Sequence, residues 1–320
     1  MGDSNKHFLK IIEWNINCCK TSSLKLEKWN TIAKYISTES PDILVLTECG
    51  TDFDNVNFRE MLKNLTNTEW EVYYNENPTY NYIAVLVSKN SDIKLVIPKE
   101  SDFGTEMHPD RVAVEITFKD DTSIRVLGIR MRTGGSTLEQ RILQNIQLVH
   151  DIQALEPDII IGDFNTCSEM EGLNIYNATT WKKKNIIWEG KERKLKQEFC
   201  EWNEWLDKFG KNNEYPTNVL ATFCKFIESK NKEYQYWAGD ERTPFSYKPI
   251  RSNIATAPDT LVWNSRQIIS VKANYHPNLC VSDTRIPKKP KEIEENWPSD
   301  HCMLIANIEI LSEQHLAEDS

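Results

Sequence analysis

The sequence lacks the features that mark membrane-spanning and secreted proteins. No stretch approaches the roughly 18 consecutive apolar residues that a membrane helix needs. The polar start, Met1 to Lys6, contains no hydrophobic segment of a signal peptide, and Lys6 stands where a myristoylation signal has Ser or Thr. We therefore expect a cytoplasmic protein without a membrane partner.

The cysteine patterns of zinc-binding and disulfide-rich proteins are missing as well. None of the eight cysteines forms a Cys-x-x-Cys pair or stands at zinc-ligand spacing from a histidine. Most of them are therefore interpreted as small core residues in a reducing compartment. This interpretation agrees with a cytoplasmic location.

Composition and charge limit the classes of function. The chain has 320 residues, 39% of them hydrophobic and 27% charged, which is typical of a globular protein. Its formal net charge of −10 repels polyanions at long range and counts against a general nucleic-acid coat protein. A nuclease stays open, because a carboxylate-lined cleft is acidic until it binds a divalent metal.

Apolar patterns predict a chain of strands and helices. Helices are expected over 24–40 and 58–65, and a long helix begins at Ser136 or Thr137 and continues to Val149. Fully apolar runs predict buried strands, and alternating runs predict strands with one exposed face. The expected strands cover 8–14, 43–46, 70–74, 83–88, 93–97, 110–118, 124–131, 159–161, 259–263, 268–272 and 303–310.

After Asn165 the chain leaves this regular pattern for about 75 residues, which is long for a loop. We predict an insertion at about 170–240 with structure of its own. Its first part, around Lys182–Lys196, carries seven Lys or Arg against two Glu. This basic stretch is either a solvated face or a contact for a nucleic-acid backbone.

Polar side chains flank several of the apolar strands. Each of them alone is explained by a turn or a cap. Their recurrence at successive strand ends indicates a common site, because ligands bind outside strand ends in α/β sheets. Carboxylates and a histidine dominate the set, which suits a hard divalent cation and proton transfer. The seven residues are Asn15, Glu48, Asp163, Asn165, Asp259, Asp300 and His301.

Five short segments in this set resemble the endonuclease/exonuclease/phosphatase superfamily, which has the DNase I-like fold. They occur in the order typical of the family. The segments are Ile-Glu-Trp-Asn at 12–15, Pro-Asp-Ile-Leu-Val-Leu-Thr-Glu at 41–48, Gly-Asp-Phe-Asn at 162–165, Pro-Asp-Thr-Leu-Val at 258–262 and Ser-Asp-His at 299–301.

The resemblance covers almost the whole chain and implies a single domain, 1–320, that carries the insertion. The implied fold class is α/β (α+β), a four-layer α/β/β/α sandwich of two mixed, mainly antiparallel sheets.

The resemblance also implies a metal site. Glu48 is expected as the principal ligand of Mg²⁺ or Mn²⁺, and Asn15 and Asp300 are expected to hold the metal or its waters. A few carboxylates together with water are the ligands that Mg²⁺ prefers.

Four further residues are implied in catalysis. Asp163 orients or deprotonates the attacking water, and Asn165 positions it against the phosphate. His301, held by Asp259, donates to a phosphoryl oxygen. An Asp–His pair fixes the tautomer of the imidazole and favours its charged form, which suits this role.

One position departs from the family pattern. Family nucleases place a His or Tyr on the strand before the long helix, whereas this chain has Arg130 and Arg132 there. We assign Arg130 to that position. A guanidinium binds phosphate with two hydrogen bonds but stays protonated, so it cannot serve as a general acid.

The leading functional hypothesis is a Mg²⁺-dependent phosphodiesterase that cuts the nucleic-acid backbone, with DNA preferred over RNA and endonuclease action expected. One alternative keeps the chemistry and acts on a small-molecule or lipid phosphoester. Another is a non-catalytic binding protein on the same fold, which the arginine substitution motivates.

Overall fold

The structure is a computed structural model. It describes residues 6–16, 25–49, 57–75, 83–89, 92–99, 110–131, 148, 151–152, 154–165, 234–237, 259–276, 299 and 301–312.

The first sheet is built from β1 (Lys6–Asn15), β2 (Ile43–Thr47), β3 (Trp70–Tyr74), β4 (Ala84–Ser88), β11 (Ile268–Tyr275) and β12 (Leu304–Leu311). The strand order is β11-β12-β1-β2-β4-β3. Only β1 and β2 are parallel among these neighbours, and the other pairs are antiparallel.

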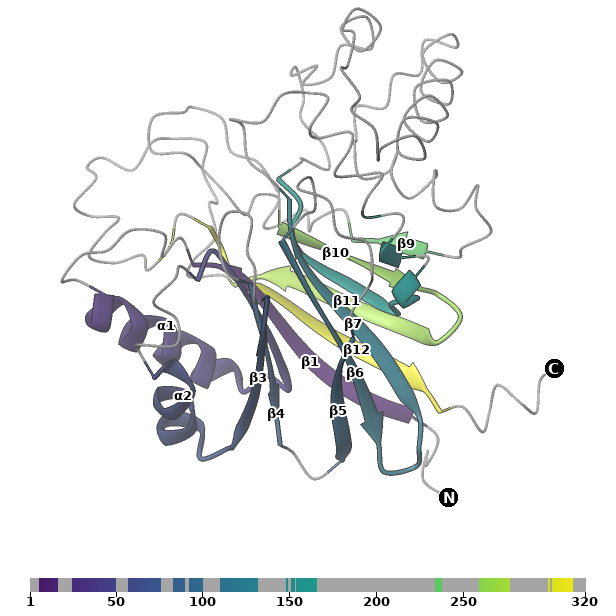
Figure 1. The fold of residues 1–320 in the computed structure, drawn as a ribbon, viewed down its shortest axis with the longest axis horizontal. Helices are drawn as coiled ribbons and strands as arrows, with labels where there is room; N and C mark the ends of the chain where they lie inside the picture. Colours follow the sequence, from purple (N-terminus) through teal and green to yellow (C-terminus); the bar gives the residue numbers. More distant parts are fainter. Residues whose placement is uncertain are drawn as a thin grey trace, which may run out of the picture.

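The second sheet is built from β5 (Ile93–Lys99), β6 (Asp110–Phe118), β7 (Ser123–Arg130), β8 (Ile159–Asp163), β9 (Tyr234–Tyr236) and β10 (Asp259–Asn264). The order is β5-β6-β7-β8-β10-β9, and only β7 and β8 are parallel neighbours. The two sheets lie against each other in the centre of the molecule (Figure 1). The predicted pair of mixed, mainly antiparallel sheets is confirmed.

Apolar side chains from both sheets fill the layer between them. Alternate residues of β1 and β2 face this layer, among them Ile11 and Val45, and they meet Val126 of β7 and Ile161 of β8 in one cluster. The strands β2 and β8 begin as continuous apolar runs because all of their residues are buried, on both faces.

Two helices cover the outer face of the first sheet. They are α1 (Lys25–Glu39) and α2 (Phe58–Thr66), which lie together beside the sheet in Figure 1. Trp29 of α1 packs on Phe58 of α2, with ring centroids 4.7 Å apart, and both contact the cluster that includes Trp14 of β1. The helices and every strand expected within the described ranges are therefore confirmed.

Other expectations fall largely outside the described residues. Of the long helix expected from Ser136 or Thr137, residue 148 is described, and it is helical and buried. The basic stretch and the other residues of the expected insertion lie outside, apart from 234–237, which contain β9. None of the helices in the described ranges is long and apolar enough to cross a membrane.

Gly162 has a specific structural reason to be glycine. The residue lies inside β8, opposite Ile129 of β7. A Cβ atom added to Gly162 would lie 1.9 Å from the carbonyl oxygen of Ile129, and its φ is +157°. Close backbone approach between two strands therefore requires glycine here.

Replacing Gly162 by Ala is expected to lower the free energy of unfolding by about 3 kcal/mol or more, because the new methyl group collides with backbone. Gly128→Ala is the matched control. A Cβ atom there would meet side-chain carbons of Val45 and Val85 at 3.0 and 3.1 Å, so a loss of about 1 kcal/mol is expected. Urea titration followed by tryptophan fluorescence measures both, and equal losses would contradict this explanation.

Candidate active site

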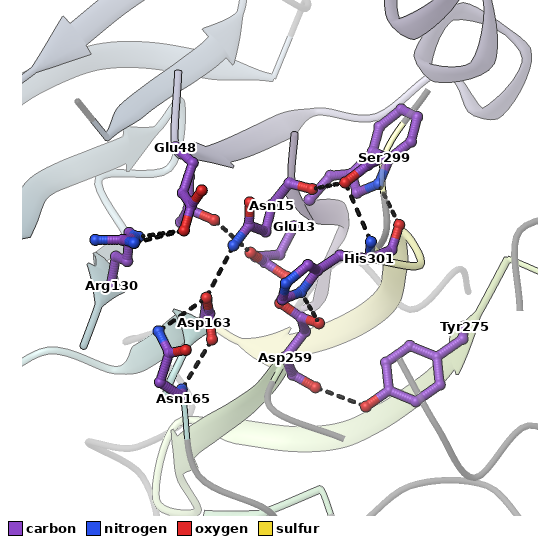
Figure 2. A network of polar contacts seen from close by, with 12 residues as sticks. Glu13, Asn15, Glu48, Arg130, Asp163, Asn165, Asp259, Tyr275, Ser299 and His301 are labelled. Carbon is purple, nitrogen blue, oxygen red and sulfur yellow. Dashed lines mark hydrogen bonds and ion pairs between the residues drawn. The ribbon is translucent and has the colours of Figure 1, made fainter. Parts of the chain in front are cut away.

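The layer between the sheets turns from apolar to polar at one end. On β1, Leu9 and Ile11 face the core, and Glu13 and Asn15 follow on the same face. Other strands of both sheets end or begin with buried polar side chains at this same end (Figure 2). These are Thr47 on β2, Asp110 on β6, Arg130 on β7, Asp163 on β8 and Asp259 on β10.

Three hydrogen bonds hold the carboxylate of Asp163. The side-chain amide of Asn15, from the other sheet, donates to Oδ2 over 2.9 Å. The backbone N–H of Asn165 donates to Oδ1 over 2.8 Å, and its side-chain amide donates to Oδ2 over 3.0 Å. Asn165 can do both because its φ is 48°, in the left-handed region that Asn tolerates. The orientation of the Asp163 carboxylate is therefore fixed.

His301 and Asp259 form a second buried unit. Nδ1 of His301 lies 2.8 Å from Oδ2 of Asp259, and the carboxylate is fully buried. The indole N–H of Trp14 donates to the carbonyl oxygen of His301 over 2.9 Å, and Ser299 accepts from its backbone N–H over 3.1 Å. The carboxylate favours a proton on Nδ1, which leaves Nε2 for a substrate.

Glu48 connects the two sheets through Arg130. It directly follows β2 with a φ of 56°, an unusual conformation for a glutamate. Nε of Arg130 donates to Oε1 of Glu48 over 3.0 Å, and Nη2 donates to the same oxygen. The third guanidinium nitrogen, Nη1, lies 3.6 Å from Oδ2 of Asp110. Backbone in the left-handed region, such as that of Glu48, is common at functional sites.

Glu13 is a further acid of the site that was not among the predicted site residues, and it is fully buried among the other polar groups (Figure 2). Thr47 donates to Oε1 of Glu13 over 3.3 Å, and Oε2 has no hydrogen-bond partner among the described residues. The available signal was a carboxylate inside an otherwise apolar strand. That signal is weak, because both neighbours of Glu13, Ile12 and Trp14, are core residues.

Burial and mutual repulsion shift the pKa values of these acids. Burial, followed by the charge of Asp259, raises the pKa of Asp163 to about 6. Burial, with Asp259 and Asp163 nearby, raises the pKa of Glu13 well above its usual value. Burial lowers the pKa of Arg130, but attraction to Glu48 and its other acidic neighbours outweighs this effect and the net shift is upward. The site therefore favours additional positive charge.

Seven of the eight predicted site residues lie in the described ranges, and the structure brings them to one end of the sandwich. Asp300 lies outside the described residues. The seven are Asn15, Glu48, Arg130, Asp163, Asn165, Asp259 and His301.

Comparison with known families agrees with this architecture. The model described as the Endonuclease/Exonuclease/phosphatase family matches residues 12–301. The chain belongs to this family. Proteins of this family are generally hydrolytic enzymes that act as metal-dependent phosphoesterases. Among curated proteins, none matches the sequence significantly.

Several solved structures share the DNase I-like fold. ANGEL2, a 2',3'-cyclic phosphatase, is 14% identical with a TM-score of 0.59, and the match covers 96% of each chain. D. rerio TDP2, solved in complex with a single-strand DNA product, is 11% identical with a TM-score of 0.55, and the match covers 94% of this chain and 98% of that one. Truncated Caenorhabditis elegans TDP2 is 16% identical with a TM-score of 0.50, and the match covers 94% and 97%. At these identities the likeness shows the fold alone.

The residues of this family member fit a divalent cation. Asp163, Asp259 and His301 each offer one ligand atom, and these atoms lie within 4.8 Å of one another. The buried Oε2 of Glu13, without a hydrogen-bond partner in the described part of the chain, adds to the excess of oxygen ligands. Carboxylates withdrawn from water are stabilised by a proton or by a nearby cation, and a divalent ion can compensate two of them at once. This group differs from the predicted metal ligands, among which Glu48 is paired with Arg130.

Glu13→Gln is expected to raise the free energy of unfolding by about 1 kcal/mol in metal-free buffer at neutral pH, because folding buries an acid beside two other carboxylates. Glu115→Gln is the control, since Glu115 is paired with Arg125 at 2.7 Å and with Lys99 at 3.1 Å. No gain is expected for the control. Urea titration of both variants tests this, and a loss of stability in Glu13→Gln would argue against an uncompensated acid at this position.

Proposed function

We propose that the protein is a Mg²⁺- or Mn²⁺-dependent phosphodiesterase that hydrolyses the nucleic-acid backbone, acting as a DNA endonuclease. One observation carries the proposal. The Asp163 carboxylate, oriented by Asn15 and Asn165, lies within 4.8 Å of ligand atoms of the Asp259–His301 pair. This arrangement combines a base for water with a donor for phosphate.

The chain's own residues divide the work. Asp163 accepts a hydrogen bond from the attacking water and orients or deprotonates it, and Asn165 positions that water against the phosphate. His301 donates from Nε2 to a phosphoryl oxygen while Asp259 holds Nδ1. Positive charge at this point stabilises the charge that develops on the phosphate oxygens in the transition state.

Glu48, Asn15 and Asp300 would hold a divalent cation, and this cation would supply further positive charge beside the phosphate. Arg130 carries a permanent positive charge, and because a guanidinium keeps its proton it cannot protonate the leaving group. We infer that water supplies that proton.

DNA is the proposed substrate for two reasons. D. rerio TDP2, which has the same fold, was solved with a single-strand DNA product. The stretch around Lys182–Lys196 carries a local excess of positive charge in an otherwise acidic chain, and we propose that it contacts the phosphate backbone. A chain that combines an acidic site with a basic segment suits a polyanion that is cut beside a metal.

A cleavage assay with plasmid DNA, single-stranded DNA and RNA tests this proposal. We expect Mg²⁺- or Mn²⁺-dependent cleavage that EDTA abolishes. Asp163→Asn should reduce the rate by about 100-fold or more, because the amide cannot accept a proton from water. Asp120→Asn is the matched control and should cleave at the wild-type rate. Asp120 pairs with His7 and lies in the turn between β6 and β7, at the opposite end of this hairpin from Asp110 and Arg130.

The other outcomes identify the alternatives. Release of phosphate from small phosphoesters, with nucleic acid left intact, indicates a phosphatase, the class of enzyme to which ANGEL2 belongs. Folded protein that hydrolyses neither class is a binding protein and overturns the proposal. Equal rates for Asp163→Asn and wild type would remove Asp163 from catalysis.

A further inference from the structure

Arg130 is a buried cation that already has a partner. Its side chain is 3% exposed, and two of its nitrogens, Nε and Nη2, donate to Oε1 of Glu48. A buried guanidinium requires such compensation, since removing one member of a buried pair leaves an uncompensated charge. The pair joins the strand end of β7 to the residue that follows β2 in the other sheet.

The guanidinium has a second acidic neighbour. Nη1 lies 3.6 Å from Oδ2 of Asp110 and has no hydrogen-bond partner among the described residues. Strand register also places Arg130 directly beside both Asp110 and Asp163. Arg130 therefore keeps acidic neighbours on its own sheet if Glu48 turns away from it.

The Glu48 carboxylate thus has two potential partners, the Arg130 guanidinium and a divalent cation. We propose that Arg130 and the divalent cation compete for Glu48, so that metal binding frees the guanidinium to bind a phosphate oxygen of the substrate. This inference rests on the proposed function, because it assigns Glu48 to the metal. Beyond the proposed function, it adds that Arg130 exchanges Glu48 for a substrate phosphate when metal binds.

The exchange couples the two binding events. Before metal binding, the Arg130–Glu48 pair keeps the buried charges compensated and occupies the guanidinium donors. After metal binding, Glu48 is compensated by the ion, and Nε and Nη2 become available for two parallel hydrogen bonds to phosphate. By linkage, metal then strengthens phosphate binding, and phosphate strengthens metal binding by the same factor.

Metal affinity of Arg130 variants tests the competition. Mn²⁺ binding is measured by electron paramagnetic resonance on protein without substrate. Arg130→Gln removes the competing charge, and its dissociation constant for Mn²⁺ should fall by about fivefold or more. Arg111→Gln is the matched control. Arg111 lies on β6, the strand beside β7, and is paired with the buried Asp151 at 3.0 Å, and the Mn²⁺ affinity of this variant should equal that of wild type.

Phosphate binding gives a second readout. The probe is a single-stranded phosphorothioate oligonucleotide, and its affinity is measured with and without Mn²⁺. Wild type should bind the probe more tightly with metal, and Arg130→Gln should lose most of this difference. Arg130→Lys keeps the charge without the planar pair of donors and should show an intermediate dependence on metal.

A third measurement uses only the wild-type protein, so it does not depend on the stability of a variant. The Arg130 Nε–H resonance of ¹⁵N-labelled wild type should shift when Mg²⁺ is added in the absence of substrate, because its acceptor changes. An unchanged resonance at saturating Mg²⁺, or an Arg130→Gln protein that binds Mn²⁺ no more tightly than wild type, overturns the competition.

The two proposals fail differently. Wild type that binds Mn²⁺ and cleaves DNA, with unchanged or weaker Mn²⁺ binding in Arg130→Gln, leaves the proposed function intact and refutes the exchange. In that case Arg130 orients Glu48 for the ion. Wild type that binds no Mn²⁺ and cleaves nothing refutes both.

Discussion

Carboxylates withdrawn from water between two sheets are the constraint on which this site depends. Glu13, Asp110, Asp163 and Asp259 are each at most 4% exposed. Hydrogen bonds from Asn15, Asn165 and Thr47 satisfy individual oxygens, but they do not balance the charge. Among the described residues, Arg130 and His301 supply the nearby positive charge. An additional cation would complete the balance, so the stability of the site and its proposed chemistry depend on the same buried charges.

The sandwich makes this cluster rigid. The polar residues belong to strands whose other residues form the apolar core, so their backbone positions are set by packing several residues away. Gly128 lets the second sheet approach Val45 and Val85 of the first, and Gly162 lets β8 approach β7. Side chains held on packed strands keep their mutual geometry better than side chains on loops. Glu48 and Asn165, just beyond strand ends, reach the site through left-handed backbone.

Local patterns are sufficient for the elements and for most of the residues that meet in the candidate site. Apolar runs ending in polar residues locate β2 and β8, with Glu48 and Asp163 at their ends. Glu13 shows where this approach fails. From Ile11 to Asn15 both faces of β1 are buried, one by the helices and one by the second sheet, so the sequence does not alternate there and gives no sign of which side chain faces the polar end. Asp110 could not be recognised from the sequence either. It stands at the start of β6, where an aspartate is equally well explained as a turn residue.

The sequence by itself determined which segments become strands and which of them end in carboxylates, amides and a histidine, because hydrophobic periodicity and turn chemistry are local properties. Only the tertiary structure decided which of these groups meet. Arg130 pairs with Glu48, 82 positions away, and His301 pairs with Asp259. Such contacts depend on how two twisted sheets pack face to face, and that packing is a property of the whole core, which no single stretch of sequence encodes.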